Sequence, residues 1–227
     1  MSRIKIFLVI VFIVALYKTG YPDIYIEEKI YSTIPGKLFH GIKKTYIIKD
    51  KVFLVDPTVA IKTLFDYANN LVYTIDDAKK DVTVYKLNNF KLPVNANLSP
   101  DFSALTERDL FSKESGNKKK IGKYNCFEFV IYIPKKAAMT RLWLTKDNEI
   151  PLATYFTFLE KNSNGLMKKI IPLMTANNSC IVESTTTIVR PKETEKNFKQ
   201  ELIKILTDSI PDELFNLPAD YRKLTVE

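Results

Sequence analysis

The stretch Tyr124–Ile133 constrains the fold more than any other part of this chain, because bulky apolar residues recur at every second position along it. A period of two places those side chains on one face of a β-strand. Met139–Thr145 follows after a short connection and alternates in the same way. We therefore expect an antiparallel hairpin here. One face of its first strand carries Phe127, Phe129, Ile131 and Ile133.

Other stretches rich in β-branched and aromatic residues predict further strands. Asp50-Lys51 and the charged segment 76–80 indicate tight turns between neighbouring strands. Because most connections are short, the sheet is expected to be antiparallel. The predicted strands are Asp23–Thr33, Leu38–Lys49, Lys51–Asp56, Leu71–Thr74, Val82–Leu87 and Cys180–Val189.

Three stretches change to helical spacing. Ser99 is a suitable N-cap before Pro100, which predicts a short helix over Ser99–Lys113. Pro151–Thr175 predicts two helices, and Asn197–Leu206 predicts one amphipathic helix. The expected fold class is α+β, mainly antiparallel β, with helices packed on one face of the sheet; an all-β fold is the alternative.

The first twenty residues predict export from the cytoplasm. Arg3 and Lys5 precede Ile6–Leu16, an apolar run that suits a signal peptide and is shorter than the about twenty residues needed to cross a bilayer. Lys18 stands where cleavage prefers a small residue, so an uncleaved anchor stays open, as does a buried N-terminal strand. We expect residues 1–20 to be a signal peptide or anchor, and residues 21–227 to form a single domain.

Cys126 and Cys180 are the chain's two cysteines. An even number of cysteines in an exported chain favours a disulfide, which would close a long loop and stabilise the fold. The alternative is a pair of buried free thiols.

The sequence contains no constellation typical of catalysis. His40 is the single histidine, and no G-x-S-x-G or phosphate-binding glycine pattern is present. Glu27 and Glu28 are adjacent on a predicted strand and so point to opposite faces, while Asp76-Asp77 lies in a predicted turn. Glu128 and Arg141 are expected to pair across the hairpin for structural reasons. We expect no enzyme activity, no cofactor and no metal.

The formal net charge is +8, and three of the positive charges lie in the first twenty residues. The remainder is a mild excess spread along the chain, which favours weak contact with an anionic membrane surface. The densest basic run is Lys118-Lys119-Lys120, interpreted as a solvated loop. Because no groove-reading motif accompanies it, we expect no nucleic-acid binding.

Two segments of the predicted hairpin resemble a known family. Lys120–Phe129 and Arg141–Asp147 resemble a glycine–aromatic–Cys strand and a W-x-T-x-D strand found in a family of exported bacterial proteins of unknown function. The closing Leu217–Tyr221 resembles that family's P-x-x-Y ending. The family is similar in fold to the periplasmic lipoprotein carriers LolA and LolB. The resemblance therefore implies a curved antiparallel half-barrel, with helices on its concave face, in a periplasmic or envelope-associated protein.

Binding of an apolar ligand is the function expected from this fold and from the 14 Phe and 12 Tyr of the chain. We expect a non-catalytic binder of a lipid or another apolar ligand, such as an envelope carrier or chaperone for lipids or lipoproteins. A structural or protein-interaction module of the envelope is the alternative, and a hydrolase with a hidden cleft is a third reading. The candidate cavity residues are Phe127, Phe129, Ile131, Leu142 and Leu144.

Overall fold

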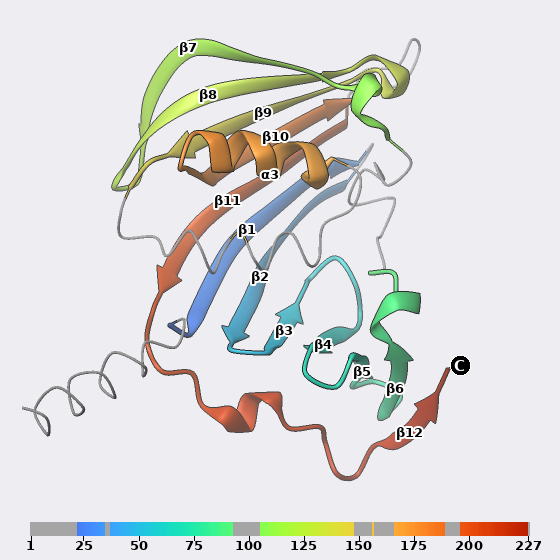
Figure 1. Cartoon of the computed structure of the whole chain (residues 1–227). Coiled ribbons are helices and arrows are strands. Elements are labelled where there is room, and N and C mark those ends of the chain that lie inside the picture. The colour runs from blue at the N-terminus through green and yellow to red at the C-terminus, as the bar shows by residue number, and fades with distance from the viewer. Residues whose placement is uncertain are drawn as a thin grey trace, which may run out of the picture.

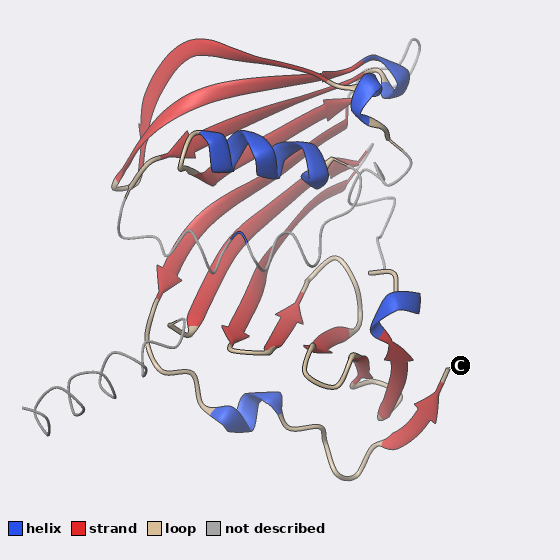
Figure 2. Ribbon diagram, viewed as in Figure 1, coloured by secondary structure: helices blue, strands red, loops and turns tan. Residues whose placement is uncertain are grey.

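A single 12-stranded sheet forms the body of the protein in the computed structural model (Figure 1). The structure describes residues 22–34, 37–92, 105–147, 156, 166–188 and 196–226. The strand order is β12-β6-β5-β4-β3-β2-β1-β11-β10-β9-β8-β7, so β12 and β7 are the two edges and the sheet does not close into a barrel. Figure 2 shows how strongly strands dominate over helices.

The first half of the chain is an antiparallel meander in which each strand pairs with the next. Short turns connect most of these strands, and Asn70 and Lys80 adopt the positive φ that such turns require. The meander confirms the expected antiparallel pairing. Its strands are β1 (Ile24–Ile34), β2 (Lys37–Ile48), β3 (Lys51–Val55), β4 (Lys62–Asp66), β5 (Leu71–Asp76) and β6 (Asp81–Lys86).

The second half adds six more strands to the same sheet. They are β7 (Phe111–Ile121), β8 (Tyr124–Ile133), β9 (Ala138–Thr145), β10 (Cys180–Ile188), β11 (Lys196–Leu206) and β12 (Arg222–Thr225). β11 pairs antiparallel with β1 and so joins the two halves, whereas β12 pairs parallel with β6 at the far edge. The predicted hairpin over Tyr124–Ile133 and Met139–Thr145 is confirmed as β8 and β9.

Helix α3 (Met167–Ala176) lies across β9 and β10 on the concave face of the curved sheet (Figure 1). It is the one α-helix whose bounds the structure describes, so the expected cover of several helices is confirmed only in this part. Short 3-10 turns complete the described helical residues: η1 (Leu87–Asn89), η2 (Glu107–Asp109), η3 (Pro134–Lys136) and η4 (Asp212–Phe215). No helix in the described ranges is long and apolar enough to cross a membrane.

The opposite, convex face is covered near β1–β5 by the chain that follows β11. Ile210 and Phe215 are buried there against Leu64, with tyrosines and Phe53 packed around them. Asp23 accepts a hydrogen bond from the backbone N–H of Ile210 at 3.1 Å, which ties this segment to the start of β1. Both faces of this half of the sheet therefore exclude water.

Several helical predictions are wrong. Asn197–Leu206 is not a helix but most of strand β11. Within Ser99–Lys113, residues 105–113 hold only η2 and the start of β7, and residues 99–104 lie outside the described part of the chain. The second helix expected within Pro151–Thr175 is confirmed as α3, while the first falls on residues of which only Phe156 is described. The expected export segment, residues 1–20, also lies outside the described residues.

The expected disulfide is wrong as well, because Cys126 and Cys180 are buried free thiols. Cys126 in β8 and Cys180 in β10 both lie opposite Thr145 of β9, one on each side of it. Two strand spacings place their Cα atoms about 10 Å apart. A disulfide needs Cα atoms within about 7 Å, so the strand between them prevents the bond.

Candidate functional site

The five predicted cavity residues lie together on the concave face beneath α3. Phe127, Phe129 and Ile131 alternate along β8, and Leu144 and Leu142 of β9 lie directly opposite the two phenylalanines. Ile131, Leu142 and Leu144 are fully buried, Phe129 is nearly so, and Phe127 is half-buried. The alternation in the sequence therefore grouped these side chains correctly, whereas their role in binding stays a prediction.

Helix α3 fills the space over these residues. Ile170, Ile171 and Met174 are buried against the strands, and Leu166, Met167 and Leu173 pack at the margin of the same cluster. The helix has no side-chain N-cap and contains Pro172, which cannot donate the hydrogen bond of a helix interior. Apolar contact with the sheet is therefore the main interaction that holds this short helix in place.

A second apolar surface continues along the same face toward β6. Ile24, Ile47, Val52, Phe65 and Val72 lie opposite one another in turn across five neighbouring strands, so their side chains share one face. All five are buried in one cluster. Phe156 packs against both this cluster and the one beneath α3, so the two clusters meet at this side chain.

A polar group lies between the two apolar clusters. The ammonium of Lys43 is 3.3 Å from the carboxylate of Glu28, which also accepts a hydrogen bond from the amide of Gln200. Burial acts to lower the pKa of Lys43, but attraction by Glu28 and Asp56 outweighs it and raises the pKa above its ordinary value. Sequence reasoning missed this group, although Glu28 falls in line with Ile26 and Ile30 on one side of the predicted strand.

Other polar side chains on the central strands are also buried. The hydroxyls of Thr140 and Thr186 are hydrogen-bonded at 2.8 Å between β9 and β10. The hydroxyl of Ser32, two positions from Ile30 on the same face, is buried without a hydrogen-bond partner. Buried polar side chains therefore lie among the apolar ones on β1, β9 and β10.

The convex face of β7–β10 carries charges that are paired with one another. Glu128 accepts hydrogen bonds from Ser115 and Asn117, and the predicted pairing with Arg141 is confirmed at 3.9 Å. Burial acts to raise the pKa of Glu128, but these partners outweigh it and lower the pKa. Lys119 lies 2.8 Å from Glu183 and stacks over the ring of Trp143. These contacts connect neighbouring strands and indicate a structural role.

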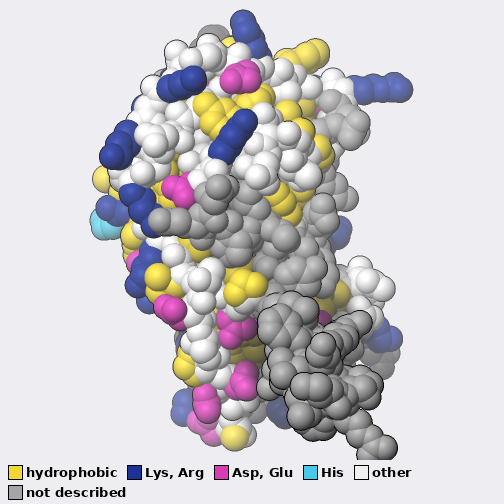
Figure 3. Space-filling model, turned by 60° about the vertical axis from the view of Figure 1, so that its left-hand side comes forward, with side chains coloured by type: hydrophobic (Ala, Val, Ile, Leu, Met, Phe, Trp, Pro, Cys, Tyr) yellow, Lys and Arg dark blue, Asp and Glu magenta, His cyan; other side chains and the backbone are white. Residues whose placement is uncertain are grey.

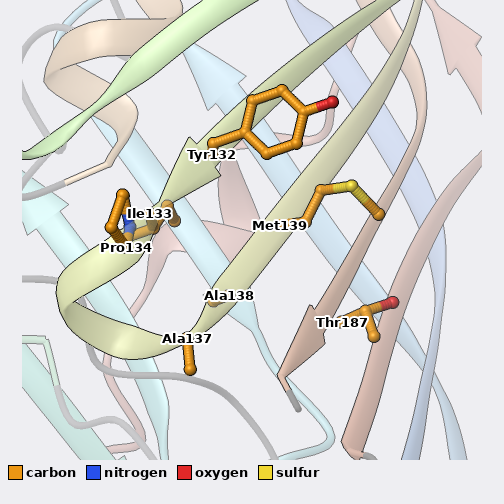
Figure 4. Close-up of a pocket in the computed structure, with 7 residues that line it drawn as sticks. All are labelled: Tyr132, Ile133, Pro134, Ala137, Ala138, Met139 and Thr187. Carbon is orange, nitrogen blue, oxygen red and sulfur yellow. The ribbon is translucent and has the colours of Figure 1, made fainter.

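A shallow apolar depression of about 300 Å³ lies at the β8–β9 hairpin, with Thr187 of β10 at its side (Figure 4). Tyr132, Met139 and Thr187 lie opposite one another in register, and Tyr132 is on the face of β8 opposite Phe129 and Ile131. The depression is thus separate from the predicted cavity residues.

The residues weighed for catalysis do not assemble. His40 is exposed on β2. The neighbours Glu27 and Glu28 contact different partners, Tyr25 and Lys43. Asp76 accepts hydrogen bonds from two backbone N–H groups of its turn, and Asp77 binds Lys62. Within the described ranges, no three His, Cys, Asp or Glu side chains lie close enough to hold a metal ion.

Comparison with solved structures gives matches that cover most of this chain at low sequence identity. PNGF-II in the C2 space group matches 90% of it with a TM-score of 0.38 and 14% identity, and this chain spans only 31% of the PNGF-II chain. An uncharacterized conserved protein from Thermus thermophilus matches 96% of this chain and 99% of its own, with a TM-score of 0.46 and 8% identity. A LolA superfamily protein from Nitrosomonas europaea matches 86% of this chain and 90% of its own, with a TM-score of 0.30 and 8% identity.

Sequence comparison gives a clearer result. No curated protein matches the chain. A family model described as a domain of unknown function, DUF4412, matches residues 48–221, which include both segments that resemble a family of unknown function. That resemblance is thereby confirmed. Because the match covers most of the chain, the protein belongs to the DUF4412 family.

Proposed function

We propose that the protein is a non-catalytic binder of a lipid or another apolar ligand on its concave face, exported to the bacterial periplasm or envelope. One observation carries the proposal: an open curved sheet presents two apolar surfaces on one face, and in the described part of the chain the short helix α3 covers one of them by apolar contacts. A lipid or the acyl chains of a lipoprotein would take the place of those contacts. The predicted export segment fits such a role.

Helix α3 is short and weakly stabilised, so a ligand could displace it from the sheet. Helices of fewer than about 12–15 residues are marginal by themselves in water, and Pro172 weakens this one further. An apolar ligand that occupies Phe129, Leu142 and Leu144 would replace the apolar contacts that α3 makes with them.

A structural or protein-interaction module is the second candidate. Ile131, Leu142 and Leu144 are fully buried by the protein's own side chains, as in an ordinary core. If α3 never leaves the sheet, these residues only stabilise the fold. A ligand binder should carry bound ligand when it is purified, whereas a structural module should carry none.

Native mass spectrometry of the full chain, purified from its own envelope before and after mild organic extraction, tests the proposal. We expect a bound mass in the lipid range that extraction removes. The extracted protein should then bind the apolar dye N-phenyl-1-naphthylamine. A protein without bound mass that also rejects the dye would contradict ligand binding and favour the structural module.

Two variants in β8 show where the dye binds. Phe127→Ala shortens a half-buried side chain on the concave face, and Tyr132→Ala shortens an exposed one that lines the hairpin depression on the opposite face. We expect Phe127→Ala to weaken dye binding and Tyr132→Ala to leave it unchanged. The reverse result would place the apolar site in the depression and overturn the concave-face assignment.

A further inference from the structure

The basic run Lys118-Lys119-Lys120 lies in edge strand β7 and not in a loop, and the strand divides its three side chains between two faces. Lys119 lies opposite Cys126 and is paired with Glu183 on the convex side. Lys118 and Lys120 lie opposite Phe127 and Asn125, which places them on the concave side of the sheet. Lys119 therefore has a structural role, whereas Lys118 and Lys120 lie on the face that carries the predicted cavity residues.

A third lysine reaches the same place from the end of β9. The ammonium of Lys146 lies 5.4 Å from the centre of the Phe127 ring. Lys118, Lys120 and Lys146 are all exposed, and none of them forms an ion pair within the described part of the chain. Figure 3, turned so that this end of the sheet comes forward, shows Lys and Arg side chains over the upper part of the molecule with hydrophobic side chains among them. We define these three lysines as the basic rim.

The basic rim connects to the apolar cluster beneath α3 through Phe127. Phe127, which lies opposite Lys118 and near Lys146, packs edge-to-face against Phe129 with ring centres 6.0 Å apart. Phe129 and Ile131 continue the apolar row along β8 for roughly 14 Å from Phe127. A molecule lying along this row meets unpaired positive charge at one end and mainly apolar side chains of β8 and β9 along the rest, with Glu114 of edge strand β7 opposite Phe129.

We infer that the basic rim binds the anionic headgroup of an amphiphile, a phosphate or carboxylate, whose acyl chain lies along Phe127, Phe129 and Ile131. This inference rests on the proposed function and names its ligand class: an anionic lipid. Lysine ammonium groups bind phosphate and carboxylate oxygens as point charges on flexible stems, which suits headgroups of different shapes. The paired charges of the convex face contribute no such site.

Binding of oleate and of oleyl alcohol to the extracted full chain, below their aggregation concentrations, tests the inference by titration calorimetry. The two probes share a chain and differ in headgroup charge. The rim variant carries Lys118→Gln, Lys120→Gln and Lys146→Gln. Its matched control carries Lys86→Gln, Lys91→Gln and Lys223→Gln, which remove equal charge from exposed positions in β6, after η1 and in β12, the strands at the other edge of the sheet from β7.

We expect the rim variant to bind oleate about tenfold more weakly, the combined effect of three exposed charge contacts, and to bind oleyl alcohol unchanged. The control variant should match the wild type with both probes. Added salt should weaken oleate binding by the wild type more than by the rim variant.

Other outcomes distinguish failure of the headgroup site from failure of the proposed function. If the rim variant binds oleate as tightly as the wild type, the headgroup site is wrong and the apolar binder survives. If the wild type binds neither probe, the proposed function fails and this inference with it. If inorganic phosphate alone binds the wild type as tightly as oleate does, the rim is an anion site that needs no acyl chain, and the lipid assignment is overturned.

Discussion

Glu28 and Lys43 lie directly opposite each other on β1 and β2, with 3.3 Å between carboxylate and ammonium. They lie on the concave face, which also carries the two apolar clusters. Removing charges from water is costly unless they are paired and hydrogen-bonded. The side-chain amide of Gln200 in β11 donates a further hydrogen bond to the carboxylate of Glu28. The three residues thereby connect β2, β1 and β11, the strands at which the two halves of the sheet meet.

Replacing Lys43 by Met should lower the free energy of unfolding by about 1–3 kcal/mol, because Glu28 would keep only its hydrogen bond from Gln200. Urea unfolding followed by circular dichroism measures the change. The double variant Glu28→Gln with Lys43→Met removes both charges and should recover part of the loss. If the double variant is as unstable as the sum of its single variants, the pair is not coupled and this interpretation fails.

Cys126 and Cys180 should resist thiol reagents in the folded protein. Burial raises the pKa of Cys126 to about 11 and that of Cys180 to about 12, so almost no thiolate forms near about pH 8. We expect no reaction with dithionitrobenzoate in native buffer, and release of both thiols once guanidinium unfolds the chain without any reductant. Absence of reactive thiols after unfolding would show that the two cysteines are oxidised, contrary to the structure.

The sequence predicts the β8–β9 hairpin well because its hydrophobic alternation has no interruption. Phe127, Phe129 and Ile131 keep a strict period of two, and this period alone fixes which residues share a face. The cysteine pairing could not be predicted in the same way. It depends on the insertion of β9 between β8 and β10, a long-range arrangement that no local pattern contains.

The mistaken helix over Asn197–Leu206 has a definite structural cause. A register shift in β11 skips Ile203, so that Leu202 lies opposite Glu28 and Ile205 lies opposite Ile26. Residues three apart thus fall on one face of a strand, which is the spacing typical of a helix. Pairing with strands on both sides then decides in favour of β structure. The polar group around Glu28 was missed because its three members, Glu28, Lys43 and Gln200, come from three separate strands.

Leu142→Ala should cost about 2–5 kcal/mol of unfolding free energy, because the side chain is fully buried beneath α3 and its removal leaves a cavity. Leu38→Ala is the matched control, since Leu38 is 68% exposed and its truncation should change stability by about 0.5 kcal/mol or less. Denaturant unfolding of both variants measures the difference. Equal stability of the two variants would show that α3 does not seal this part of the sheet.

Asp109 should make the protein sensitive to acid. Hydrogen bonds from Lys135 and from the backbone and hydroxyl of Thr106 lower the pKa of Asp109 to about 2, below the value of about 3.9 for an unfolded aspartate. A group whose folded pKa is lowered contributes stability above its unfolded pKa and loses that contribution as the pH falls to the folded one. The stability that depends on Asp109 should therefore disappear between about pH 4 and about pH 2. Asp109→Asn should be less stable than the wild type at neutral pH, and the gap should narrow through this window in thermal unfolding experiments. A gap that stays constant from neutral pH to about pH 2 would contradict the ion pair between Asp109 and Lys135 as its source.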